Sequence, residues 1–127
     1  MTYREYLKHN KDLIAMVHLP ALPGTPRNTL TPERIIETAL SEALFYQHAG
    51  FQTVMIENMH DVPYARSAGA EITALMGIIG KKIKEQGLFC GIQILAGCNI
   101  EALGTALAAG LDFIRVEGFV FGHIADE

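Results

Sequence analysis

One pattern repeats along this chain, in which a short apolar run is followed by an amphipathic stretch of helical period. The apolar runs are nearly continuous and rich in Val and Ile, which is typical of parallel strands that are covered on both faces. Parallel strands that alternate with helices define an α/β fold. We therefore expect strands near residues 13–19, 53–58, 88–95 and 111–117, with a helix in each of the three intervals.

The predicted helices carry end signals of their own. Thr31 is expected to cap a helix that begins at Pro32, because proline is favoured at the first helical position. Asn99 is expected to cap the last helix, and Met1 to Lys11 to form a short entry helix or arm beneath the strands. The helix after the second strand has an apolar stripe, formed by Ile72, Leu75, Met76, Ile79 and Ile83.

These strand-helix units match the first half, (β/α)3-β4, of a TIM barrel, which contains eight such units. We expect residues 1–127 to form one partial barrel domain whose C-terminal half is missing. The open edges of its first and last strands favour self-association or pairing with the missing half-barrel. The alternative is an open, doubly wound α/β domain that is complete in itself, although no glycine-rich phosphate loop supports it.

Composition and charge limit the classes of partner that we expect for this chain. With 10 Lys plus Arg against 14 Asp plus Glu, the net charge of −4 gives no basic footprint for nucleic acid. No apolar run reaches the roughly 20 residues of a membrane-spanning helix, so no integral membrane segment is expected. Cys90 and Cys98 follow no metal-binding or redox spacing. We interpret both as structural thiols in a reducing, cytoplasmic compartment, and a mitochondrial one stays open.

The alternation within the strands separates two faces. One face is β-branched and suited to packing under helices, with Val54 and Ile56 as its clearest pair. The other face is expected to be the barrel interior, and it becomes polar toward the C-terminal strand ends, where barrels place their active sites. The polar residues expected at this end are His18, Glu57, Gln93, Arg115 and Glu117.

Three segments also carry a family resemblance: IAMVHLPALPGTP from Ile14, IENMHDVP from Ile56 and AGLDFIRV from Ala109. In this order they closely resemble the opening half of the BtpA family, also called BtpA/SgcQ, over about Leu13 to Glu127. The resemblance implies a barrel of the ribulose-phosphate-binding type in full-length members, which are about twice this long. The family takes its name from photosystem I biogenesis. It brings no secure reaction, substrate or cofactor, so the cofactor stays unknown.

Glu57, Glu117 and His18 are the candidate catalytic residues. Two carboxylates that face one cavity shift each other's pKa and can act as acid and base, with His18 as a base or ligand. The alternative is a structural network, in which Arg115 neutralises both carboxylates and His18 is a hydrogen-bonded rim residue. Both interpretations stay open at the level of sequence.

The candidate substrate-binding residues are Arg115, Asn58, Gln93 and Asp61. Asp61 has a second interpretation, in which its carboxylate bonds the backbone of the Asp-Val-Pro turn ahead of Pro63. His60 and its acidic neighbours match no metal-ligand spacing, so no metal site is assigned.

The strand-end residues predict a TIM-barrel protein of unresolved activity, catalytic or not, that binds a small polar or phosphorylated ligand at the C-terminal ends of its strands. The alternative is a non-catalytic assembly factor of the photosystem I biogenesis type, which acts through protein partners. In a complete barrel, Phe119, Phe121 and Ile124 of the apolar segment from Gly118 to Ala125 are expected to pack over the site or under the next helix. In this chain we expect them to be mobile and partly exposed.

Overall fold

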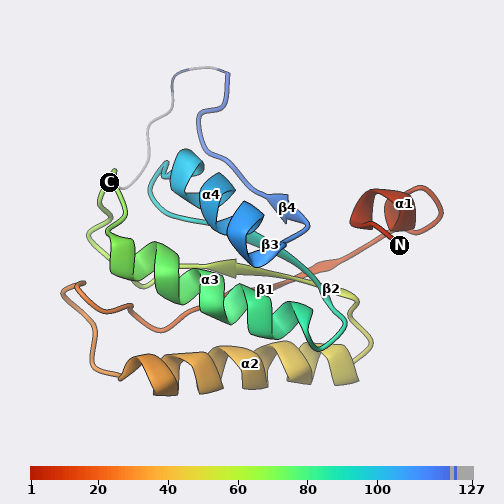
Figure 1. The fold of residues 1–127 in the computed structure, drawn as a ribbon, viewed down its shortest axis with the longest axis horizontal. Helices are drawn as coiled ribbons and strands as arrows, with labels where there is room; N and C mark the ends of the chain where they lie inside the picture. The colour runs from red at the N-terminus through yellow and green to blue at the C-terminus, as the bar shows by residue number, and fades with distance from the viewer. Residues whose placement is uncertain (121, 123–127) are drawn as a thin grey trace.

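The computed structural model describes residues 1–120 and residue 122 (Figure 1). Four strands form one parallel sheet in the order β1-β2-β3-β4. The strands are β1 (Ile14–His18), β2 (Thr53–Glu57), β3 (Phe89–Gln93) and β4 (Phe113–Ile114). The helices are α1 (Tyr3–Leu7), α2 (Pro32–His48), α3 (Ala70–Lys84) and α4 (Asn99–Ala109). The predicted α/β fold is confirmed.

The order of the strands distinguishes between the two expected architectures. A doubly wound sheet reverses its strand order at one point and carries helices on both faces. Here each strand pairs in parallel with the next one along the chain, and α2, α3 and α4 lie on one side of the sheet (Figure 1). This arrangement is consistent with half of a TIM-like barrel and argues against the doubly wound alternative.

The main core lies between the sheet and these three helices. Val54 and Ile56 face it as predicted and are fully buried. All five residues of the predicted α3 stripe are buried in the same cluster. Burial of each Ile or Leu side chain stabilises the fold by roughly 1.5–3 kcal/mol. This packing holds in place the sheet whose strand ends carry the polar residues.

Of the two predicted N-cap residues, one is confirmed and the other is wrong. Thr31 caps α2, since its hydroxyl accepts a hydrogen bond from the Arg34 amide at 3.3 Å. The N-cap of α4 is Cys98, so Asn99 is the first residue of this helix and does not cap it. The prediction was wrong because an Asn side chain also bonds well to a neighbouring loop, and here it does so.

The opposite face of the sheet is covered at its N-terminal end by α1, as expected for an entry helix. The Tyr3 ring lies 5.1 Å from the Phe89 ring and 5.0 Å from the Phe113 ring, measured between centroids. A side chain at Gly91 would overlap the Phe113 ring, so glycine is required beneath this aromatic contact. The N-terminal half of this face is therefore mainly apolar packing, with Thr53 as a buried polar residue, and the charged residues lie at its C-terminal end.

Strand β4 is shorter than the predicted 111–117, since it ends at Ile114. The Arg115 amide still donates to the Ile92 carbonyl oxygen at 3.0 Å, and beyond it the chain leaves the sheet. Arg115 and Glu117 therefore follow the strand rather than lie in it. Phe119 is exposed, as expected for this chain, while Phe121 and Ile124 lie outside the described residues.

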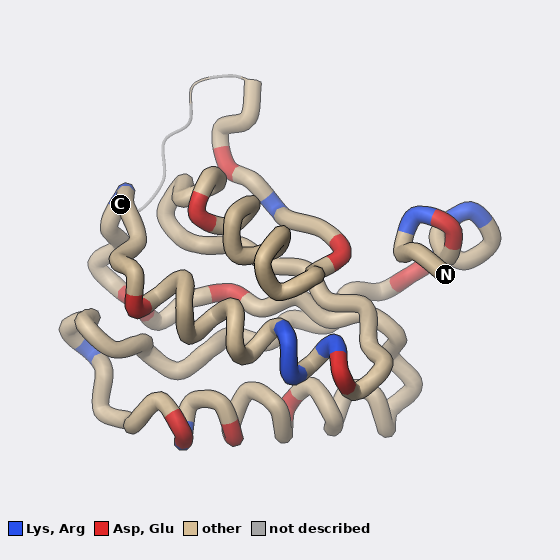
Figure 2. Tube along the Cα trace, in the orientation of Figure 1, with Lys and Arg blue, Asp and Glu red and all other residues tan. Residues whose placement is uncertain are grey.

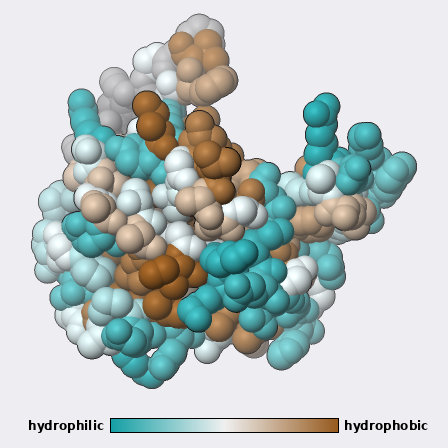
Figure 3. Space-filling model, viewed as in Figure 1, coloured by the Kyte–Doolittle hydropathy of each residue, from teal (hydrophilic) through white to brown (hydrophobic). Residues whose placement is uncertain are grey.

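The molecular surface is uneven in charge and hydropathy. Lysines gather at the C-terminal end of α3, and acidic residues lie along α2 (Figure 2). Apolar side chains are visible on the face where α3 and α4 lie (Figure 3). In the described part of the chain, no helix has the length and apolar character needed to cross a membrane.

Candidate functional site

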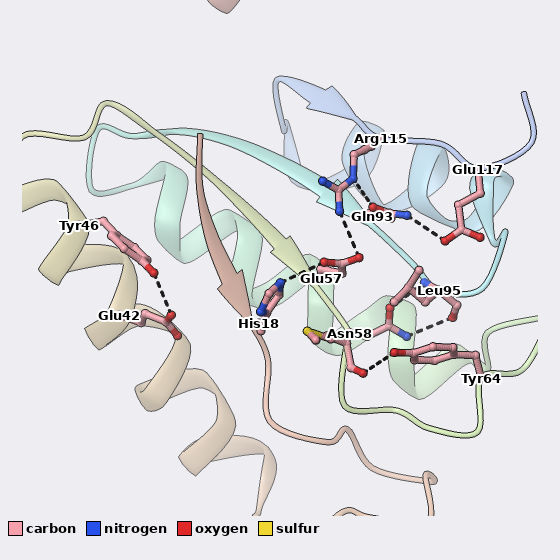
Figure 4. A network of polar contacts seen from close by, with 11 residues as sticks. His18, Glu42, Tyr46, Glu57, Asn58, Tyr64, Gln93, Leu95, Arg115 and Glu117 are labelled. Carbon is pink, nitrogen blue, oxygen red and sulfur yellow. Dashed lines mark hydrogen bonds and ion pairs between the residues drawn. The ribbon is translucent and has the colours of Figure 1, made fainter. Parts of the chain in front are cut away.

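The parallel register lines up the polar strand ends. His18 pairs with Glu57, and Glu57 pairs with Gln93, so three strands present these residues in one row. Arg115 extends the row just after β4 (Figure 4). Directly beneath lies an apolar row, formed by Met16, Met55, Gly91 and Phe113. The predicted convergence of charged residues at the C-terminal strand ends is therefore present in the structure.

Five of the seven candidate residues form one chain of contacts. The Glu57 carboxylate lies 3.2 Å from His18 Nε2 through Oε2 and accepts a hydrogen bond from Arg115 Nη2 at 3.2 Å through Oε1. Arg115 Nε donates to Gln93 Oε1. Gln93 Nε2 in turn donates to Glu117 Oε1 at 3.0 Å. We call His18, Glu57, Gln93, Arg115 and Glu117 the strand-end network (Figure 4).

Glu57 is the centre of this network. Its side chain is only 9 % exposed, and each carboxylate oxygen has one partner from a different strand or strand end. Burying a carboxylate is costly unless cationic or hydrogen-bonding partners surround it. The main hydrophobic core lies on the helix-covered face of the sheet and does not include this charge.

The two partners of Glu57 remain accessible. The side chain of Arg115 is 51 % exposed, and that of His18 is 38 % exposed. Arginine has five N–H donors, of which the network uses Nε and one on Nη2. The second ring nitrogen of His18 makes no hydrogen bond to the described residues. Both side chains thus keep polar atoms for a further group above the strand ends.

Glu117 is held in place by a residue that the sequence had assigned to a helix cap. Asn99 Nδ2 donates to the Glu117 carbonyl oxygen at 2.8 Å, and the Glu117 amide donates to Asn99 Oδ1 at 3.3 Å. This two-way contact fixes the backbone after β4 and points the Glu117 carboxylate toward Gln93. Asn99 is a positioning residue, and an Asn at the start of a helix gave no signal that separates this role from capping.

Asn58 and Asp61 do not belong to the strand-end network. Asn58 binds the loop after β3, since its Oδ1 accepts from the Leu95 amide at 2.7 Å and its Nδ2 donates to the Leu95 carbonyl oxygen at 3.3 Å. Asp61 Oδ1 accepts from the Leu22 amide at 2.8 Å, and Asp61 Oδ2 accepts from Asn58 Nδ2 at 3.1 Å. We call this pair the loop brace, because it ties together the loops after β1, β2 and β3.

The interpretation of Asp61 as a bond to its own turn was wrong. The Asp61 carboxylate bonds Leu22 and Asn58, with Thr25 also beside it, and in the described residues it makes no bond to the turn toward Pro63. Burial raises the pKa of the Asp61 carboxyl, while the hydrogen bonds from Leu22 and Asn58 act in the opposite direction. Asn58 and Asp61 also line a cavity of about 230 Å³ beneath the loop that contains Gly24.

The two cysteines have the geometry of structural residues. Cys90 and Cys98 are free, buried thiols. Burial raises the pKa of Cys90 to about 12, so this thiol stays protonated at neutral pH and is a poor nucleophile. Among residues 1–120 and 122, no group of three or more His, Cys, Asp or Glu side chains is arranged to hold a metal ion.

The fold and the network together define a parallel α/β protein with a charged site at the C-terminal ends of its strands. The sequence profile of the BtpA family matches residues 9–127. The chain belongs to the BtpA family, as its three motifs predicted. No solved structure matches it.

Relatives extend from archaea to animals. An uncharacterised mitochondrial protein of Caenorhabditis elegans is 44 % identical over 122 residues, which cover 91 % of this chain and 44 % of that protein. An uncharacterised protein of Pyrococcus horikoshii is 38 % identical over 109 residues, 85 % of this chain and 42 % of that protein. The sgc-region protein SgcQ of Escherichia coli is 32 % identical over 126 residues, 97 % and 46 %. The chain therefore spans less than half the length of these relatives.

Proposed function

We propose that the strand-end network binds a small anionic molecule that also carries hydroxyl groups, such as a sugar phosphate, both in this chain and in a complete barrel of the ribulose-phosphate-binding type. The observation that supports this most strongly is the buried Glu57 carboxylate, held between His18 and Arg115 at the end of a central strand. A barrel places its ligands at this end of the sheet. Because the packing of the hydrophobic core does not require the Glu57 charge, binding of a ligand is the better explanation for it.

Different residues of the network would bind different chemical groups of the ligand. The guanidinium of Arg115 offers unused N–H donors to a phosphate or carboxylate group, for which its planar geometry is well suited. The Glu117 carboxylate is an acceptor for ligand hydroxyl groups, and Asn99 fixes its backbone. Gln93 bridges the two and keeps them at a set separation.

The same geometry supports proton transfer by His18. When Nε2 carries the proton and donates a hydrogen bond to the Glu57 carboxylate, the other ring nitrogen is an unprotonated acceptor. Glu57 then acts as a positioning residue that fixes the tautomer and the orientation of the imidazole, and His18 is the catalytic base. This assignment makes the protein an enzyme only if the ligand presents an acidic proton to His18.

An assembly role through protein partners is the competing proposal, and binding measurements separate the two. A small-molecule site requires the polar atoms of Arg115 and Glu117, whereas a protein-docking surface does not. For the compartment, the buried free thiols favour a reducing interior, either cytoplasmic or mitochondrial as designated for the worm relative.

Amide NMR titrations with ribose phosphate and with inorganic phosphate test the proposal on this chain. Arg115→Met should weaken binding of both ligands at least tenfold, which is about 1.4 kcal/mol. Lys84→Met is the matched control, because it also removes the cation of an ion pair, at the opposite end of the sheet. This control should leave the affinity unchanged. Absence of binding to the wild type, or equal binding to Arg115→Met, contradicts the proposal.

A further inference from the structure

The outer side of α3 and α4 carries a groove that the strand-end network does not touch. A cavity of about 510 Å³ is lined by residues of both helices. A second cavity of about 380 Å³ continues it toward the start of α4. The two cavities share four lining residues, which are Thr73, Ala74, Thr105 and Ala108. They are therefore one continuous depression, which we call the α3–α4 groove.

One large apolar side chain stands exposed in this groove. Ile78 lines it and is 47 % exposed. The lining around Ile78 is completed by small side chains, among them Ala74, Ala108 and Ala109. Figure 3 shows apolar side chains over these helices. An exposed apolar depression of this kind is a common feature of interaction sites.

The groove stays open whether or not the barrel is complete. It lies between two neighbouring helices of the same sheet face, both of which are present in this chain. In a barrel, the helix of the next unit packs against the far side of α4 and leaves this groove on the outside. The missing half-barrel is therefore not its occupant.

Charge is distributed unequally along the groove. Lys81 and Lys82 line the end where α3 terminates, and Glu101 lines the end where α4 begins (Figure 2). Neither lysine makes an ion pair with the described residues, whereas Lys84 on the same turn pairs with Asp112. Glu85 also lies at the basic end and leaves it with a net charge of one positive unit.

We infer that the α3–α4 groove is a homodimer interface, in which a second copy packs antiparallel so that Lys81 and Lys82 of each copy face Glu101 of the other. Helices α3 and α4 run in the same direction, because both follow parallel strands. A twofold axis across the groove reverses this direction in the second copy and brings the basic end of each copy against the acidic end of the other. The apolar side chains between the ends then bury each other.

Charge-reversal variants of the 127-residue chain test this interface by sedimentation equilibrium over a concentration series. We expect the wild type to be a dimer. Glu101→Lys, and separately Lys81→Glu with Lys82→Glu, should each raise the dissociation constant at least about tenfold, because each change acts twice across the axis and creates repulsion. The chain that combines all three substitutions should return to within about threefold of the wild type.

Lys8→Glu with Lys11→Glu is the control, since these lysines lie near α1 and outside the groove. This control should leave the dissociation constant as in the wild type. A monomeric wild type overturns the inference. So does association that ignores the groove variants, which would place it at the strand edges. Failure of the combined chain to recover, or equal weakening by the control, also overturns it.

Discussion

The two ends of the sheet each carry a carboxylate paired with a cation, and they differ in how fully the pair is enclosed. At the N-terminal end, Asp112 binds Lys84 Nζ at 2.8 and 3.1 Å and accepts the Cys90 amide at 2.7 Å. At the C-terminal end, Glu57 binds His18 and Arg115, both of which remain open to solvent. The first pair accepts a hydrogen bond from a backbone amide of the sheet, while the second presents polar side-chain atoms to solvent.

This difference shows how an ion pair that supports the fold can be told from one that serves a ligand. The Asp112 carboxylate is bonded to the backbone of the adjacent strand, so its loss damages the sheet itself. The strand-end network bonds side chain to side chain, apart from the Asn99 contact with the Glu117 backbone. The sheet beneath it does not depend on these bonds. We therefore expect substitutions at the two ends to affect different properties.

Asp112→Asn should give the largest loss of stability. The amide group places a donor against the Lys84 ammonium and leaves a partly buried charge without its partner. We expect the free energy of unfolding to fall by about 1–3 kcal/mol. Urea unfolding followed by circular dichroism measures this. An unchanged midpoint would show that the Lys84–Asp112 pair does not support the fold and would break the comparison.

Glu117→Gln should give the opposite result. The amide oxygen of Gln can still accept from Gln93, and Asn99 still holds the backbone, so stability should change by less than about 0.5 kcal/mol or rise slightly. Affinity for ribose phosphate should fall about tenfold, because a carboxylate is the stronger acceptor for hydroxyl groups. Inorganic phosphate has no sugar hydroxyls and serves as the control ligand. A loss of stability with unchanged ribose phosphate binding would make Glu117 part of the fold.

Asp61→Asn should have the smallest effect, and one that depends on pH. Because burial raises the pKa of Asp61 above 3.8, its protonated form is favoured by folding. This contribution is present below the pKa of the unfolded chain and is lost as pH rises through the folded pKa. The stability of the wild type relative to Asp61→Asn should therefore be greater near about pH 4 than near about pH 7. Urea unfolding at both values checks this, and a difference of opposite sign contradicts the assignment.

Much of the fold and the network was predictable, because both depend on short periods. A strand alternates its side chains with a period of two, so the sequence around Val54 and Ile56 identifies the helix-facing side. Parallel register then brings the last inward residue of each strand to one height. This is why the sequence alone predicts that His18, Glu57 and Gln93 meet, as they do in the sheet.

The loop contacts were not predictable, because they join residues that are distant along the chain. Asp61 reaches the Leu22 amide across 39 positions, and no local pattern distinguishes that bond from a bond within its own turn. Asn99 similarly exchanges a helix cap for the Glu117 backbone 18 positions away. Strand β4 ends at Ile114, and the Asn99 contact holds the backbone beyond it, at Glu117.

The most direct test of this comparison measures unfolding midpoints of the wild type, Asp112→Asn and Glu117→Gln with and without millimolar ribose phosphate. A ligand that binds only the native state raises the midpoint, by an amount that grows with the logarithm of its concentration relative to Kd. The account predicts that Asp112→Asn has a low midpoint with the full ligand increment, and that Glu117→Gln has a normal midpoint with most of the increment lost. Equal increments in all three proteins, or none in the wild type, would contradict it.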